Sequence, residues 1–143
     1  ESDRQALLQG LREGLITAIT SDHLPPRIED KYCEYEAAAW GAAGMETLFG
    51  ALWQDLHPHF SLEELLPFIS RGPREVLGLE VPTIAPGEEA ELSLFDPEQK
   101  WTLKASQAQS KAVNNPWYDK PLRGRAVGVI NKGVTVLWEE RLR

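Results

Sequence analysis

The chain has 143 residues, 42% of them hydrophobic and 26% charged, with a formal net charge of -7. This is the composition of a globular domain, and the acidic balance excludes nucleic acid or an anionic membrane as the main partner. No run approaches the roughly 20 apolar residues of a membrane span, and Cys33, the only cysteine, excludes an internal disulfide. We expect a cytoplasmic protein in which Cys33 serves packing. Four cations are predicted to be solvated surface charge: Arg71, Arg74, Arg123 and Arg125.

The predicted elements begin with a helix over residues 2–13, where apolar side chains recur at helical spacing. The chain starts without an initiator methionine and enters this helix at once, so we expect a piece of a longer protein. Gly14 ends the helix, and the apolar, β-branched stretch 15–21 is predicted to be a buried strand. An acid, a histidine and two prolines follow within residues 22–26, and the prolines force a loop.

A helix, a glycine, a strand and an acid-bearing loop form one step of a parallel sheet or barrel. Catalytic groups of such barrels lie at the C-terminal ends of the strands. Asp22 is therefore a candidate catalytic carboxylate. The alternative is a turn aspartate that only hydrogen-bonds its own backbone.

The middle of the chain is predicted to be helical over residues 35–56. Small residues between 37 and 44 permit close backbone approach, which suits tight helix packing or amide groups that face an anion. The His-Pro-His run at 57–59 could chelate a metal, but it lies in a connection between helices, so we expect no ligand role. A capping box opens a helix over 62–70, and a short helix over 72–77 follows.

Prolines and glycines punctuate short segments in the last part of the chain. Residues 91–95 alternate as a strand and run into an Asp-Pro turn signal. Residues 127–130 and 134–138 are predicted to pair as a hairpin around a glycine-containing loop. We therefore divide the chain into a helical α/β part, residues 1–78, and a small β part, residues 79–143.

Several motifs along the chain resemble one enzyme family. The quoted segments are 19–25 (Ile-Thr-Ser-Asp-His-Leu-Pro), 38–47 (Ala-Ala-Trp-Gly-Ala-Ala-Gly-Met-Glu-Thr), 84–97 (Ile-Ala-Pro-Gly-Glu-Glu-Ala-Glu-Leu-Ser-Leu-Phe-Asp-Pro), 110–117 (Ser-Lys-Ala-Val-Asn-Asn-Pro-Trp) and 122–124 (Leu-Arg-Gly). In this order they resemble motifs in the C-terminal third of dihydroorotases, which are metal-dependent cyclic-amide hydrolases of the amidohydrolase superfamily. The block at 110–117 favours dihydroorotase over allantoinase and hydantoinase, whereas Ser-Asp-His at 21–23 is also allantoinase-like.

The resemblance implies a fold that is α/β plus β. Residues 1–78 would supply the last strand and flanking helices of a (β/α)8 metal-dependent hydrolase barrel, at its C-terminal end. Residues 79–143 would form the C-terminal part of a small accessory β-sandwich. A complete barrel needs about 250 residues, so most of it would lie outside this chain.

The resemblance also implies an activity, the reversible, zinc-dependent cyclisation of N-carbamoyl-aspartate to dihydroorotate in pyrimidine biosynthesis. Asp22 matches the family's aspartate that contacts metal and serves as general base and then acid. Trp40 and Gly41 match the stretch that contacts substrate. The other metal ligands belong to earlier strands, so this piece alone is expected to be inactive. The implied partners are the small-molecule substrate, further copies in a homo-oligomer, and aspartate carbamoyltransferase.

Departures from the motifs keep two alternatives open. The family's second histidine, a substrate contact, aligns with Pro26, which has neither a side-chain donor nor an N–H. Where the family's Ala-Pro-Phe-Gly motif has its proline, this chain has Ala39. One alternative is thus a dihydroorotase-like subunit that has lost catalysis and serves a structural or regulatory role. The other is a related cyclic amidohydrolase such as allantoinase.

Overall fold

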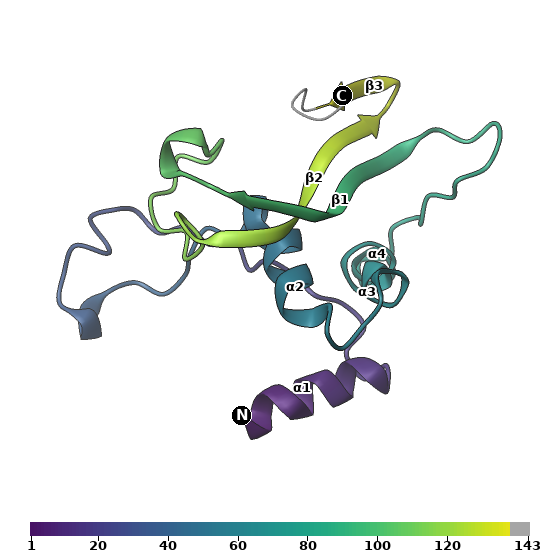
Figure 1. The fold of residues 1–143 in the computed structure, drawn as a ribbon. Coiled ribbons are helices and arrows are strands. Elements are labelled where there is room, and N and C mark those ends of the chain that lie inside the picture. Colours follow the sequence, from purple (N-terminus) through teal and green to yellow (C-terminus); the bar gives the residue numbers. More distant parts are fainter. Residues whose placement is uncertain (138–143) are drawn as a thin grey trace.

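The computed structural model describes residues 1–137 as a group of helices with a small twisted sheet lying across them (Figure 1). The elements are α1 (Ser2–Arg12), α2 (Leu48–Leu56), α3 (Leu62–Ile69), α4 (Arg71–Val76), β1 (Glu91–Thr102), β2 (Pro121–Asn131) and β3 (Val134–Leu137). Between α1 and α2 the chain makes a long irregular excursion, drawn in blue, that runs out from the body (Figure 1).

The sheet is antiparallel in the order β1-β2-β3, which confirms the predicted strand at 91–95 and the hairpin. Lys132 and Gly133 form the two-residue turn, both with positive φ, as a type I′ hairpin turn requires. Position 138 of the predicted hairpin lies outside the described residues.

The Asp-Pro step does not end β1, although Asp96 Oδ1 accepts the N–H groups of Glu98 at 2.8 Å and Gln99 at 3.2 Å, as in an Asx turn. β1 continues to Thr102, and its register against β2 shifts between Asp96 and Lys100. Proline cannot donate to a ladder, and a bulge is one of the few places where a strand accommodates it. The irregularity bends β1 without ending it.

The predicted helices are confirmed at α1, α3 and α4. At α3 the Ser61 hydroxyl accepts the Glu64 N–H at 3.3 Å, and the Glu64 carboxylate accepts the Ser61 N–H at 2.7 Å, which is the expected capping box. The continuous helix over 35–56 is wrong: only 3₁₀ turns at Tyr35–Ala37 and Met45–Thr47 precede α2. Gly41 has φ +113°, which no helix allows.

The predicted strand at 15–21 is also absent as a ladder. The stretch is extended, but within residues 1–137 its backbone makes only turn bonds to Gly10 and one bond from Ile19 N to Phe68 O at 2.7 Å. The next residues make one isolated parallel bridge, His23 to Ala42. A strand exists only where a neighbouring strand takes up its N–H and C=O groups, and no other described strand lies beside this stretch.

The core lies between α1, α3 and the extended stretch 15–20. Its buried members are Leu8, Leu11, Phe60 and Leu65. α2 packs against this core through Trp53 and Leu56. It also packs against β2, where Gly50 lets the two backbones approach: a Cβ there would lie 3.0 Å from the Gly124 carbonyl oxygen. The sheet is thereby fixed to the same helix that lines the cavity described below.

Much of the surface is unlike that of a compact monomer. The chain exposes 10660 Å², whereas a folded monomer of this mass exposes about 7,400 Å². Large apolar side chains such as Leu15 and Tyr35 are exposed. Cys33 is exposed as well, so the prediction that it serves packing is wrong. Among residues 1–137, no helix combines the length and apolar character that crossing a membrane requires.

Candidate functional site

A cavity of about 610 Å³ lies where the end of the extended stretch meets α2. Its walls come from four places in the sequence. The lining residues are Thr20, Ser21 and Asp22; Gly41, Ala42, Ala43 and Gly44; Thr47, Leu48, Ala51, Leu52, Asp55 and Leu56; and Pro116 and Trp117. The fold therefore brings two of the predicted site residues, Asp22 and Gly41, to one hollow.

Asp22 carries one of the two carboxylates that line this cavity, and Asp55 on α2 carries the other. The Asp22 backbone is left-handed, with φ 43°, a conformation that aspartate adopts more readily than most residues. Only its N–H is bonded, to Thr20 Oγ1 at 3.4 Å, and its carboxylate accepts no hydrogen bond from any residue in 1–137. The carboxylate thus does not cap its own turn, and it is open to a ligand in the cavity.

His23 holds the Asp22 loop in place. Its Nδ1 accepts the backbone N–H of Gly44 at 3.2 Å and of Met45 at 3.3 Å. Because Nδ1 is an acceptor in both bonds, the ring proton of the neutral imidazole lies on Nε2. Leu24 N adds a bond to Ala42 O at 3.0 Å, so the Asp22 loop and residues 42–45 form one unit.

Of the two predicted substrate residues, Gly41 lines the Asp22 cavity and Trp40 does not. Gly41 packs tightly on the Asp22 loop, because a Cβ there would lie 2.2 Å from the Leu24 carbonyl oxygen. Trp40 is 92% exposed and borders a smaller hollow of about 270 Å³ beside Lys31.

The connection between β1 and β2 returns to the cavity, which the sequence analysis missed. Glu46, Asn114 and Asn115 make side-chain bonds that join this connection to residues 41–47. Burial first, and then the Glu46 carboxylate, raise the pKa of Tyr118, whose hydroxyl donates to Ala112 O at 2.8 Å. A signal was present, since Glu46 and Asn114 both lie inside the quoted motifs, but nothing in the sequence pairs them.

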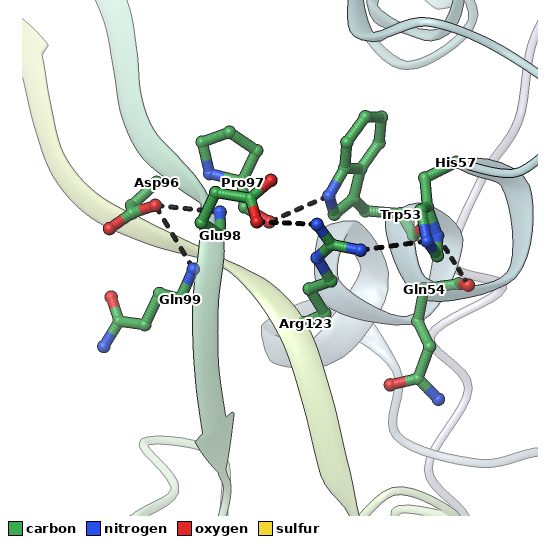
Figure 2. A network of polar contacts seen from close by, with 8 residues as sticks. All are labelled: Trp53, Gln54, His57, Asp96, Pro97, Glu98, Gln99 and Arg123. Atoms are coloured by element: carbon green, nitrogen blue, oxygen red, sulfur yellow. Dashed lines mark hydrogen bonds and ion pairs between the residues drawn. The ribbon is translucent and has the colours of Figure 1, made fainter.

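The His-Pro-His run does not form a metal centre. His57 Nδ1 lies 2.9 Å from Trp53 O and 3.0 Å from Gln54 O, so it carries the proton, and Nε2 accepts from Arg123 at 3.0 Å. Arg123 also binds Glu98 at 2.6 Å, as Figure 2 shows. The prediction of Arg123 as solvated charge is therefore wrong.

This network joins α2 to the sheet, together with the bond from Trp53 Nε1 to Pro97 O at 2.9 Å (Figure 2). We expect Arg123→Met in the full-length protein to lower the free energy of unfolding by about 1–3 kcal/mol, because it leaves the half-buried His57 nitrogen without a donor. Thermal denaturation measures the effect, with the exposed Arg27→Met as the control. Equal melting temperatures for the two variants would contradict the assignment.

Within residues 1–137 no group of three or more histidine, cysteine, aspartate or glutamate side chains could hold a metal. Asp22 offers one free carboxylate, which suits one ligand of an oxygen- and nitrogen-coordinated zinc. His23 Nδ1 is occupied by backbone donors. Within residues 1–137 this donor set could supply one metal ligand and does not complete a metal site.

Comparison with known proteins identifies the family. The model of the amidohydrolase family matches residues 1–136. This chain belongs to the amidohydrolase family. A dihydroorotase of Chlorobaculum tepidum is 34% identical over 137 residues, which cover 94% of this chain and 31% of that protein. A dihydroorotase of Ruminiclostridium cellulolyticum is 35% identical over 139 residues, covering 96% of this chain and 32% of that protein.

Solved structures agree with this family. An L-hydantoinase (dihydropyrimidinase) from Arthrobacter aurescens superimposes with a TM-score of 0.79 at 28% identity, covering 92% of this chain and 31% of that one. The resemblance to dihydroorotases is confirmed, and this amidohydrolase chain spans about a third of the length of the curated relatives it matches.

Proposed function

We propose that this chain is the C-terminal third of a dihydroorotase that cyclises N-carbamoyl-aspartate and hydrolyses dihydroorotate in pyrimidine biosynthesis. Residues 1–78 would complete a (β/α)8 barrel, and residues 79–143 an accessory β-sandwich. The observation that carries the proposal is that the Asp22 carboxylate, which no residue in 1–137 pairs, shares one cavity with the Gly41 backbone. The motif match and the dihydroorotase relatives support it.

Asp22 is the proton carrier in this proposal. An ionised carboxylate can take a proton from the water that attacks the ring carbonyl and pass it to the departing ring nitrogen. Its left-handed backbone and the His23 bonds to Gly44 and Met45 fix where this carboxylate points. The other site residues bind substrate: Gly41 by its backbone at the cavity, and Trp40 from the adjoining hollow.

A zinc ion held in part by Asp22 would supply a Lewis acid and lower the pKa of an attacking water toward neutrality. The remaining ligands would come from barrel strands outside residues 1–143. This piece alone is therefore proposed to be inactive. A cytoplasmic homo-oligomer, with aspartate carbamoyltransferase as a partner, stays part of the proposal.

Pro26 favours a second candidate. A family histidine that contacts substrate is replaced by a residue without a side-chain donor. A dihydroorotase-like subunit that has lost catalysis and serves a structural or regulatory role would have this feature. A cyclic amidohydrolase with another ring substrate, such as allantoin, is the third candidate.

One assay separates the three candidates. The full-length protein, supplied with zinc, is incubated with dihydroorotate, allantoin and hydantoin. We expect turnover of dihydroorotate only, its loss after chelation, and its return when zinc is restored, because the water needs the metal's charge. Turnover of allantoin or hydantoin instead would support a different ring substrate. No turnover of any ring by the zinc-loaded protein would favour the inactive subunit.

A further inference from the structure

We propose that Glu46 and Asn114 are positioning residues, and that residues 104–118 form a positioning loop whose docking holds the substrate-side segment 41–44. That segment 41–44 binds substrate rests on the proposed function. The docking is a claim about structure, and it can be tested apart from activity.

Glu46 anchors the positioning loop at residues 109 and 110. It lies in the 3₁₀ turn directly after segment 41–44, and its two carboxylate oxygens accept consecutive backbone N–H groups. Oε2 accepts from Gln109 N at 2.9 Å and Oε1 accepts from Ser110 N at 2.9 Å. Bonds to a carboxylate are about twice as strong as neutral ones, so this pair ties a loop that has little regular structure of its own.

Asn114 holds segment 41–44 itself. Its side-chain Nδ2 donates to Gly41 O at 3.1 Å, and its backbone carbonyl accepts Ala43 N at 3.2 Å. The two bonds lie on either side of Ala42. The Asn114 Oδ1 atom is buried and has no partner among the described residues, so the amide nitrogen alone makes the side-chain tether.

The loop also forms part of the cavity wall. Pro116 and Trp117 line the same hollow as Gly41 and Asp22. Asn115 fixes this end of the loop, since its Oδ1 accepts Trp117 N at 2.9 Å. The conformation of Gly41 and the position of Trp117 therefore depend on one docked loop that comes from the β part of the chain.

Two variants of the full-length protein test the proposal. Glu46→Gln keeps the shape but turns one acceptor into a donor that faces a backbone N–H. Asn114→Asp turns the donor that faces Gly41 O into an acceptor. Hydrogen exchange is followed in peptides covering 105–118 and 38–45, and KM and kcat are measured with dihydroorotate.

We expect Glu46→Gln to speed exchange in both peptides and Asn114→Asp to speed it in 38–45. Each should raise KM about tenfold, equivalent to about 1.4 kcal/mol, with kcat within about twofold, because a loosened binding segment weakens ground state and transition state alike. Glu88→Gln, at an exposed turn, is the matched control and should change neither readout.

The proposal is overturned if Glu46→Gln speeds exchange in 105–118 alone and leaves KM unchanged, since the loop would then be docked without positioning anything. It is equally overturned if Asn114→Asp leaves peptide 38–45 unchanged, and this variant decides alone if Glu46→Gln does not fold. A protein that turns over no dihydroorotate but shows the coupled exchange would contradict the proposed function and support the docking.

Discussion

Asp22→Asn is expected to lower kcat for dihydroorotate hydrolysis by about 10²–10⁴-fold in the full-length protein, the usual contribution of a positioned acid-base group. Asparagine keeps the size of the side chain and tolerates the left-handed backbone at φ 43°. It cannot take a proton from water at neutral pH. KM should change little, because the backbone at Gly41 is untouched.

Asp119→Asn is the matched control for this substitution. Asp119 is exposed and also left-handed, with φ 58°, so the two substitutions share their chemistry and their backbone conformation. Zinc content is measured on the same preparations. Reduced zinc would indicate that Asp22 is lost as a metal ligand, whereas unchanged zinc with low kcat would indicate that it is lost as a proton carrier. Turnover like that of the unmodified protein in Asp22→Asn would refute the assigned role.

Gly41→Ala is expected to damage stability and substrate binding together. Gly41 has φ +113°, a region that costs an alanine roughly 1–3 kcal/mol, and the new Cβ would lie 2.2 Å from the Leu24 carbonyl oxygen. Since that atom belongs to the backbone, the segment has to move. We expect a total loss of roughly 2–5 kcal/mol in the free energy of unfolding and a KM for dihydroorotate raised at least about tenfold.

Gly87→Ala isolates the contribution of the close approach. Gly87 has φ +93°, but a Cβ there meets nothing within 4 Å. It should cost only the backbone strain and leave KM unchanged. Calorimetric melting and steady-state kinetics on the two variants give the comparison, and equal losses in both would mean that the contact between Gly41 and Leu24 has no role.

Short sequence patterns correctly predicted the elements that are stabilised by residues close together in the chain. The capping box at Ser61 and the hairpin around the glycine-containing loop are fixed by neighbours a few residues away, and both are found as expected. The structure adds that the loop is a two-residue turn, since Asn131 pairs with Val134. Residues 38–44 were misassigned because a run of small residues is equally compatible with a helix and with an irregular close approach. The approach of Gly41 to Leu24 across the fold decides between them.

Charged and polar side chains were the least predictable part. Arg123 has the sequence context of a surface cation, and its partners His57 and Glu98 are far away in the chain. The same holds for Glu46, whose partners at 109 and 110 come from the connection between two strands. No periodicity reports such pairs, because sequence spacing constrains only contacts within one element.

The sequence by itself determined the family, the acid at the end of an extended stretch and the residues to examine, since these depend on residue types in order. Tertiary structure alone decided that Asp22 and Gly41 share a cavity, that Trp40 borders a different hollow, and that the loop between β1 and β2 holds the Gly41 segment. The physical reason is that hydrogen bonds between distant segments form only once the chain has folded, when packing of the apolar faces has brought a donor atom and an acceptor atom within about 3 Å of each other.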